Sequence, residues 1–320
     1  MPNVHKPRCG SKQYWPRKRA RRNYTRIRAW AKREKVKLLG FTGYKAGMLH
    51  VLTFDNNQNS TSKGQQISFA VTVVECPSLK PLSLRLYKKN PYGFYSSADI
   101  FASNFNKELA RKIRVPQKTK NNINTIKNFE NKINEYDDLS LRVYTQPVKK
   151  KKPEIFEIKV SGKDIKEKFD YAKTLLNKDI NLKDVFQEGV YVDIHAVTKG
   201  KGFQGPVKRF GVSLKSHKSE KKRRSPGNLG SWTPKKVHWA VGQHGQMGSH
   251  TRTEYNKLII SIKNPEDVNP KGGFPHYGFV KNNCLLIRGS IPGPIKRVIR
   301  MSDAIRKSKT EVIDLKEIVK

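Results

Sequence analysis

The sequence predicts a mainly β protein with an α+β insertion, a basic N-terminal tail and a long internal arm. Short apolar segments separated by glycine and proline turns recur at both ends of the chain, as in β-barrels and sandwiches. Residues 90–188 instead contain a helical apolar period and polar stretches. Residues 199–255 are rich in glycine, lysine and arginine, and no apolar period persists there.

The first β region comprises three apolar segments. Residues 37–55 are predicted to form two strands with a tight connection, because glycines recur within the segment. Residues 65–77 have the continuous apolar character of a buried strand. Residues 78–89 are predicted to form a shorter strand at a sheet edge, since proline cannot donate to a strand ladder.

Residues 90–188 are predicted to be an α+β insertion with a basic exposed face. Helices are expected near 104–113 and over 164–178, where apolar residues lie on one face. Asp164 and Glu167 have the spacing of a capping box at the second helix. The other segments are predicted strands at 139–145 and 153–162 and a polar stretch at 117–138 without predicted structure.

The arm is expected to be unstructured by itself, because it has almost nothing to bury against the entropy of ordering it. A partner outside the chain is expected to order it. Strands are predicted directly before and after the arm. The predicted organisation is a basic extension at 1–37, β-barrel parts at 38–89 and 256–320, the insertion at 90–188, a barrel strand at 189–198 and the central arm at 199–255.

The composition points to a polyanionic partner. The chain has 320 residues, 66 Lys plus Arg, 26 Asp plus Glu and a formal net charge of +40. Such a charge repels itself in an isolated compact body, so nucleic acid is the expected partner. No run has the roughly 20 apolar residues of a membrane span, and no secretory apolar region is present. The three cysteines are far apart in the sequence, which indicates neither a disulfide scaffold nor a zinc site. We expect no membrane, metal or cofactor.

One motif in the arm mimics a nucleotide site. Residues 200–205, GKGFQG, fit the G-x-G-x-x-G dinucleotide fingerprint and, with Val207, the kinase glycine loop. Pro206 and Gly211 follow, so we expect no helix at the third glycine, and no downstream acid or other kinase motif completes either pattern. We therefore expect no small-molecule substrate. The glycines instead let the backbone approach phosphates closely, and a flexible solvated hairpin is the alternative.

Seven further motifs lie at both ends and in the middle of the chain. They are GSKQYWPRKRARR (10–22), GYKAGM (43–48), AVTVVECP (70–77), the spaced pattern from Phe186 to Arg209, GNLGSWTP (227–234), GQHGQMGSHTRTEYNK (242–257) and RGSIPGPIKRVIR (288–300). Together they resemble the third large-subunit ribosomal protein family. The long insertion resembles its archaeal and eukaryotic branch, and GNLGSWTP resembles the archaeal form.

The resemblance implies a translation-protein-type β-barrel in the cytoplasmic ribosome, with large-subunit rRNA and neighbouring ribosomal proteins as partners. In that family the central arm reaches toward the peptidyl transferase centre and carries a tryptophan at its tip, which matches Trp232. An arm histidine of the family matches His217. Any role in peptide transfer is expected to be positional, because the reaction centre is RNA, so no catalytic residue is expected.

The predicted rRNA-binding residues are cations, glycines and polar residues of the tail and the arm. They are Arg17, Lys18, Arg19, Arg21, Arg22, Lys199, Gly200, Lys201, Gly202, Gly205, Lys208, Arg209, His217, Lys221, Lys222, Arg223, Arg224, Trp232, Gln243, Gln246, His250 and Arg252. A solvated face is the alternative for 221–224, and a core position is the alternative for Trp232. Trp239 is expected to pack within the arm or against the barrel, and His195 and Asp193 are expected to have structural roles.

A different class of function stays open at this point. A chromatin or chaperone protein that binds DNA or RNA without sequence preference has a similar charge. Retention on large subunits through a high-salt wash separates the two functions, because nonspecific binding falls steeply with salt.

Overall fold

The computed structural model describes residues 11–56, 59–115, 123–146, 148–306, 309–311 and 313–320. By its internal contacts the chain divides into two compact units. The core unit comprises Tyr24–Ala196 and Thr253–Lys320, and the basic unit comprises Met1–Asn23 and Val197–Arg252. The polypeptide passes from the core unit to the basic unit within β7 (Tyr191–Val197), and it returns to the core unit within β10 (Thr251–Lys263).

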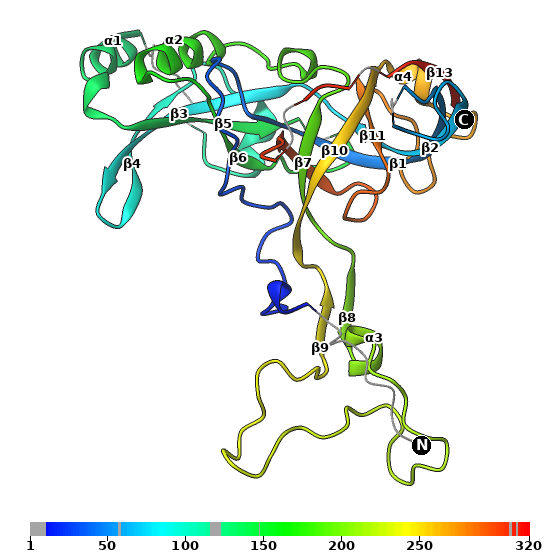
Figure 1. Ribbon diagram of the computed structural model, residues 1–320. Coiled ribbons are helices and arrows are strands. Elements are labelled where there is room, and N and C mark those ends of the chain that lie inside the picture. Colours follow the sequence, from blue (N-terminus) through cyan, green and yellow to red (C-terminus); the bar gives the residue numbers. More distant parts are fainter. Residues whose placement is uncertain (1–10, 57–58, 116–122, 147, 307–308, 312) are drawn as a thin grey trace. The chain divides into compact units, whose positions relative to one another are not determined.

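Seven strands form the main sheet (Figure 1), in the order β12-β7-β10-β11-β2-β1-β13. β12 also pairs with β1, from Gly40 opposite Ser302 to Tyr44 opposite Val298, so six of these strands form a closed ring of pairings. The mainly β class is confirmed. The five strands not yet defined are β1 (Gly40–Phe54), β2 (Gln66–Glu75), β11 (Cys284–Arg288), β12 (Val298–Asp303) and β13 (Leu315–Val319).

β1 is a single strand of 15 residues, so the prediction of two strands with a tight connection is wrong. Its glycines mark close packing and not a turn. A Cβ atom at Gly43 would lie 2.5 Å from Val74 Cγ1, and one at Gly47 would lie 2.4 Å from Phe274 Cδ1. Glycine inside a strand commonly marks such a close approach.

A second sheet of four strands also belongs to the core unit. β3 lies inside it, between β4 and β5, so its prediction as an edge strand is wrong. The register between β3 and β5 shifts between Pro81 and Ser83, and such a bulge accommodates the proline. The strands follow the order β4 (Gly93–Phe101), β3 (Leu79–Asn90), β5 (Asp138–Thr145) and β6 (Ile155–Lys159).

The helix α2 (Ile165–Leu175) confirms the predicted helix at 164–178. Asp164 is its N-cap, but its side chain makes no capping hydrogen bond, so the predicted capping box is wrong. The predicted helix near 104–113 is a short 3-10 helix, and the described part of 117–138 contains α1. The other elements of the core unit are η2 (Lys107–Arg111), α1 (Ile123–Asn131), η3 (Ile133–Glu135), η4 (Leu182–Asp184) and α4 (Pro265–Val268).

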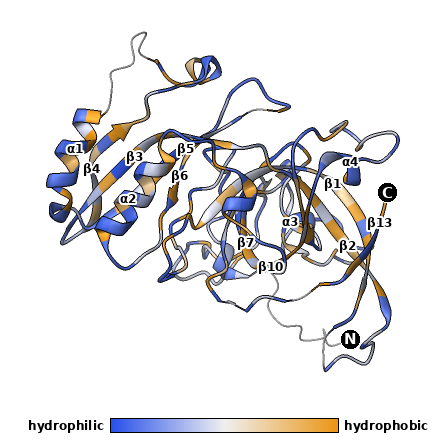
Figure 2. Ribbon diagram, turned by 90° about the horizontal axis from the view of Figure 1, so that it is seen from above, coloured by the Kyte–Doolittle hydropathy of each residue, from blue (hydrophilic) through white to orange (hydrophobic). Residues whose placement is uncertain are grey.

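One hydrophobic cluster joins the two sheets, and a second cluster is formed by strands of the main sheet. Hydrophobic residues are concentrated on the strands of both sheets (Figure 2). One buried cluster contains Leu84 and Leu139 of the four-stranded sheet, Ile194 and Ile299 of the main sheet and Phe169 of α2. Among the described residues, no helix is both long and apolar enough to cross a membrane.

The second half of the basic N-terminal extension belongs to the core unit. Thr25 and Ile27 are buried. Arg300 of β12 is also buried, and its Nη1 donates to the carbonyl of Thr25 at 2.8 Å. Lys37 Nζ lies 2.5 Å from Asp303 Oδ2. Of the extension predicted at 1–37, only the part before Tyr24 belongs to the basic unit.

Candidate RNA interface

The basic unit carries half of the net charge of the chain. It contains 21 Lys or Arg residues and one acid, Glu220, which gives +20 of the total of +40. Each ion pair found between described residues joins two residues of the core unit. The charge of the basic unit therefore exceeds what its own acids can neutralise, and an external polyanion fits it.

The arm begins with a paired base, so the prediction of an unstructured arm is wrong for this part. β8 (Gly200–Gln204) pairs with β9 (Gly245–Gly248) in antiparallel register. Gly248 closes this pairing with a φ of 71°, and a Cβ atom there would lie 1.9 Å from the carbonyl oxygen of Lys199. Only glycine adopts this conformation at that distance without strain.

A helix follows the glycine motif directly, which corrects the expectation that none forms there. α3 (Pro206–Phe210) has Gly205 as its N-cap and ends at Gly211, whose φ is 68°. Proline is well suited to the first position of a helix, because its fixed φ is helical and its missing N–H has no helical partner there. The helix has only five residues, and the sequence still lacks the acid of a dinucleotide site.

An aromatic clasp joins the tail to the arm; we define it as Trp15, Arg17, Phe210 and Trp239. The rings of Trp15 and Phe210 stack with centroids 5.3 Å apart, and Trp239 meets Trp15 edge-on at 5.5 Å. The guanidinium of Arg17 lies 4.1 Å from the centroid of the buried Phe210 ring. Aromatic pairs and cation–π contacts of this kind each contribute on the order of 0.5–1.5 kcal/mol. Trp239 therefore packs within the basic unit.

Arg209 of α3 binds the returning strand at the base of the arm. Its Nε donates to the carbonyl of Gln246 at 3.0 Å, and its Nη1 donates to the carbonyl of Gln243 at 2.9 Å. Arg17 Nη1 in turn donates to the carbonyl of Arg209 at 2.7 Å. Burial lowers the pKa of Arg209, and the nearby charge of Arg17 lowers that pKa further. This guanidinium holds the two strands of the arm together.

The tail also contacts the arm through main-chain hydrogen bonds and through the imidazole of His250. The Ala20 N–H donates to the carbonyl of Ser249 at 2.7 Å. His250 is buried, and its Nδ1 lies 2.9 Å from the carbonyl oxygen of Lys18. Because a carbonyl only accepts, this contact requires a proton on Nδ1. Burial lowers the pKa of His250, which favours the neutral ring. Arg252 adds a cation–π contact at 4.5 Å to Tyr14, which is the last residue of η1 (Lys12–Tyr14).

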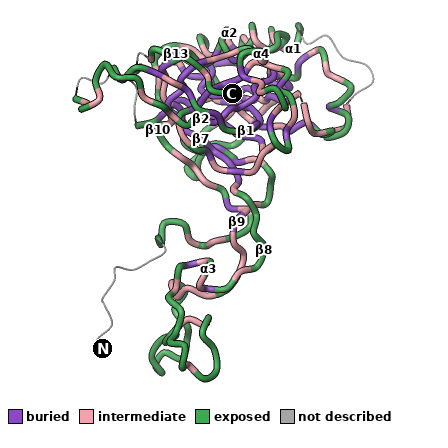
Figure 3. The backbone as a smooth tube through the Cα atoms, turned by 90° about the vertical axis from the view of Figure 1, so that its right-hand side faces the viewer, coloured by how far each residue is buried: buried purple, intermediate pink, exposed green. Residues whose placement is uncertain are grey.

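The remaining predicted rRNA-binding residues are exposed. The segment 211–244 between α3 and β9 contains neither helix nor strand, and most of it is exposed (Figure 3). The side chain of Trp232 in this segment is 80% exposed, so it is not a core residue. The exposed predicted residues are Lys18, Arg19, Arg21, Arg22, Lys199, Gly200, Lys201, Gly202, Gly205, Lys208, His217, Lys221, Lys222, Arg223, Arg224 and Trp232.

Sequence reasoning missed the internal contacts of the basic unit. It assigned RNA contacts to Arg17, Arg209 and His250, each of which makes at least one hydrogen bond within the chain. It did not identify Trp15 or Phe210 as packing partners. The interleaved aromatics of the tail were the available signal, but Arg17 and Arg209 are 192 residues apart, so local patterns could not pair them.

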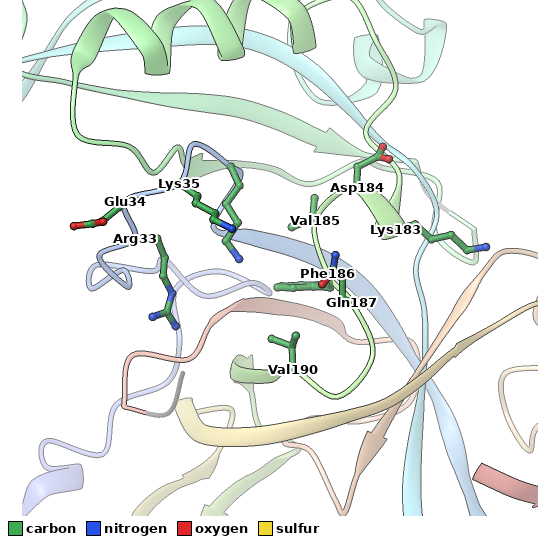
Figure 4. A pocket seen from close by; sticks show the side chains of 10 residues that line it. Arg33, Glu34, Lys35, Lys183, Asp184, Val185, Phe186, Gln187 and Val190 are labelled. Carbon is green, nitrogen blue, oxygen red and sulfur yellow. The ribbon is translucent and has the colours of Figure 1, made fainter. Parts of the chain in front are cut away.

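The core unit has a surface pocket of about 430 Å³ (Figure 4), which lies between segments 33–37 and 183–190. Arg33 and Lys37 at this pocket form ion pairs with Asp303, so part of its charge is neutralised within the fold. Its lining includes no serine, threonine, cysteine or histidine, and none of the predicted RNA-binding residues. The pocket therefore lacks the hydroxyl, thiol and imidazole groups of Ser–His and Cys–His catalytic pairs.

The chain is similar to known proteins over its whole length. The model of the family "Ribosomal protein L3" matches residues 1–320. The large ribosomal subunit protein uL3 of Archaeoglobus fulgidus is 45% identical over 313 residues, which cover 95% of this chain and 93% of that protein. The protein of the same name from Methanocaldococcus jannaschii is 44% identical over 312 residues, which cover 95% of this chain and 92% of that protein. The resemblance found from the sequence motifs is thereby confirmed, and the chain belongs to the ribosomal protein L3 family.

Proposed function

We propose that this protein is a structural constituent of the large ribosomal subunit in the cytoplasm and binds large-subunit rRNA through the basic unit. The observation that carries the proposal is the charge of this unit, with 21 basic residues against one acid. Phosphate contacts by such exposed cations supply most of the affinity of a protein for nucleic acid. Its role is structural and not catalytic.

The residues of the basic unit have two roles in this proposal. The exposed cations and glycines contact the RNA backbone, and Trp232 stacks on nucleotides. Arg17, Arg209 and His250 support that surface from within, together with the main chain at Gln243 and Gln246. Arg252 contributes by its contact with Tyr14.

The core unit has a supporting role. We propose that its closed ring of six strands is a translation-protein-type β-barrel. We further propose that neighbouring ribosomal proteins are partners of the protein and that the arm supports subunit assembly.

The salt dependence of RNA binding tests the charge argument. Replacing Lys221, Lys222, Arg223 and Arg224 together by Ala removes four exposed cations. The slope of log K against log salt for a large-subunit rRNA fragment should fall in magnitude by about 3–4, at roughly 0.7–0.9 per phosphate contact. A Lys88→Ala, Lys159→Ala control removes cations that are paired with acids and should change the slope little.

Two results would contradict the proposal. An unchanged slope for the fourfold variant would mean that 221–224 is only a solvated face. Equal affinity of the native protein for bulk DNA and for the rRNA fragment, at the same salt, would favour the nonspecific DNA- or RNA-binding alternative.

We propose in addition that Trp232 lies near the peptidyl transferase centre. It is 80% exposed, so Trp232→Ala should leave incorporation into large subunits intact while it changes tRNA binding to those subunits. Trp239→Ala, which removes a clasp residue, should instead loosen the base of the arm. Failure of Trp232→Ala to assemble would show that the residue is structural.

A further inference from the structure

The core unit has a concentration of positive charge of its own, on two segments of the insertion. Residues 107–114 comprise η2 and the residues that follow it, and residues 148–154 lie in the loop between β5 and β6. Together, as the insertion patch, they contain eight Lys or Arg and two acids, which gives a formal charge of +6. The insertion patch contains none of the residues predicted to bind rRNA.

The fold holds the two segments of the insertion patch side by side. Leu109 of η2 is buried in a small cluster with Tyr144 of β5. The Tyr144 hydroxyl accepts the N–H of Asn106 at 3.2 Å. Arg111 Nη1 donates to the carbonyl of Lys151 at 3.0 Å. The cations of the two segments therefore lie on one surface and not on separate parts of the core unit.

Acids of the chain neutralise little of this charge. Lys112 Nζ lies 3.2 Å from Glu154 Oε2, and among the described residues no other cation of the insertion patch belongs to an ion pair. Lys149 contacts the ring of Tyr277 at 5.5 Å, which leaves its charge in place. The Tyr277 hydroxyl donates to the buried Glu75. Even with this acid counted, the formal charge is +5.

Lys150 distinguishes the insertion patch from a simply solvated face. Its side chain is half-buried. Burial lowers the pKa of Lys150, Glu154 offsets part of this effect, and the charges of Arg297 and Lys112 lower the pKa further. Holding this ammonium group partly out of water beside two other cations costs free energy, which a bound anion would offset.

The composition of the insertion patch indicates what kind of anion fits. Interfaces between proteins are depleted in lysine, and their energy comes from buried aromatic anchors. The insertion patch has four consecutive lysines, 149–152, and within its described residues it exposes no large apolar side chain. Closely spaced lysines instead suit the repeated phosphates of a nucleic-acid backbone, where each contact releases a counterion. RNA therefore fits this surface better than an acidic protein.

We propose that the insertion patch binds the sugar–phosphate backbone of large-subunit rRNA, as a second RNA contact besides that of the basic unit. This proposal rests on the proposed function of the chain as an rRNA-binding protein. Lys150, Lys151 and Lys152 contact phosphates, and Arg111 positions the main chain at Lys151. Backbone contacts carry no base information, so the insertion patch adds affinity and fixes the orientation of the core unit on the RNA.

The salt dependence of binding to complete large-subunit rRNA tests the proposal with the full-length protein. A Lys150→Gln, Lys151→Gln, Lys152→Gln variant removes three cations of the insertion patch. The slope of log K against log salt should fall in magnitude by about 2–3, at roughly 0.7–0.9 per phosphate contact. A second variant, Lys151→Gln, Lys152→Gln, changes only exposed side chains and should lower the slope by about 1–2.

The matched control is Lys166→Gln, Lys178→Gln, Lys183→Gln. It removes the same charge from three exposed lysines of the core unit, each of which is followed in the sequence by an acid. This variant should leave the slope nearly unchanged. An unchanged slope in both variants of the insertion patch, or an equal fall in the control, would overturn the proposal.

The fourfold alanine variant at 221–224 reports on the basic unit separately. If it lowers the slope while the variants of the insertion patch do not, only the second RNA contact is refuted. If none of these variants lowers the slope, rRNA binding through the basic unit is refuted as well.

A photo-crosslinking amino acid at the exposed position 151 identifies the occupant in large subunits isolated through a tag on this chain. The expected result is a crosslink to rRNA. A crosslink to a neighbouring protein would show that an acidic protein segment covers the insertion patch, and the absence of any crosslink would show that the patch is a solvated face. Either result would contradict the proposal.

Discussion

Replacing Arg209 by Lys or Ala shows whether this residue holds the arm together or only contacts RNA phosphates. If its charge alone matters for phosphate binding, Arg209→Lys should behave like the native protein. If its guanidinium holds the arm together, lysine should fail nearly as badly as alanine. Lysine carries no planar fork, and it cannot donate to two carbonyls in the geometry that arginine uses.

The magnitude follows from the hydrogen bonds that are lost. Arg209 donates two short bonds, at 3.0 Å to Gln246 and 2.9 Å to Gln243. Hydrogen bonds from a charged group contribute about 1.5–3 kcal/mol each. Since Arg209 is only partly buried, we take the lower value for each bond. The loss of both is then about 3 kcal/mol, which corresponds to roughly 100-fold more frequent opening of the base of the arm.

Hydrogen exchange of the full-length protein measures this opening. The amides of β9 and of Ala20, which bonds the carbonyl of Ser249, should lose roughly 100-fold of protection in Arg209→Ala and nearly as much in Arg209→Lys, because local opening sets their exchange. Lys208→Ala is the matched control, since its side chain lies exposed on the same helix. Native protection in Arg209→Ala would refute the internal role, and native protection in Arg209→Lys alone would refute the requirement for the guanidinium geometry.

Two further predictions concern a glycine of the arm and a histidine of the core. Gly248→Ala should destabilise the base of the arm by about 2–3 kcal/mol or more, because its Cβ would lie 1.9 Å from a backbone oxygen. The Cβ of Gly200→Ala would make an ordinary 3.7 Å contact, so this variant should cost under about 1 kcal/mol. Equal hydrogen-exchange protection in the two variants would contradict the prediction. Burial, with a smaller effect of the Arg300 charge, lowers the pKa of His195 to about 4 from an ordinary 6.5. The unfolded chain therefore binds a proton at higher pH than the folded chain, and the free energy of unfolding should fall by about 2 kcal/mol from pH 7 to pH 5 through this group. Denaturant titration of His195→Gln should show a correspondingly smaller loss, and an identical pH dependence would refute the assignment.

Local patterns predicted the elements whose partners are close in sequence or whose period is strong. The helix at 164–178 has a regular apolar face and appears as α2. The errors at β1 and β3 share a different cause. Gly43 and Pro81 were taken as signs of a turn and of an edge, but the structure uses the glycine for close packing and places the proline at a bulge. Which use applies depends on neighbouring strands that the local sequence does not specify.

The candidate site was predictable in charge but not in arrangement. Counting basic residues identified the tail and the arm, and both contribute to the basic unit. Whether a given arginine faces outward depends on its neighbours in space. Arg209 and Lys208 are adjacent in sequence, yet only the first has carbonyl partners in the described structure.

The source of order in the arm also differs along its length. By its sequence the arm has too little to bury to fold alone. Its base does not fold alone, since Trp15 and Arg17 of the tail pack on Phe210 and supply the missing apolar contact. The segment 211–236 has no such contribution among the contacts that the structure describes: it carries eight Lys or Arg and one acid, forms no helix or strand, and exposes Trp232. That segment has too little to bury within the chain, so an external polyanion is the partner that can order it.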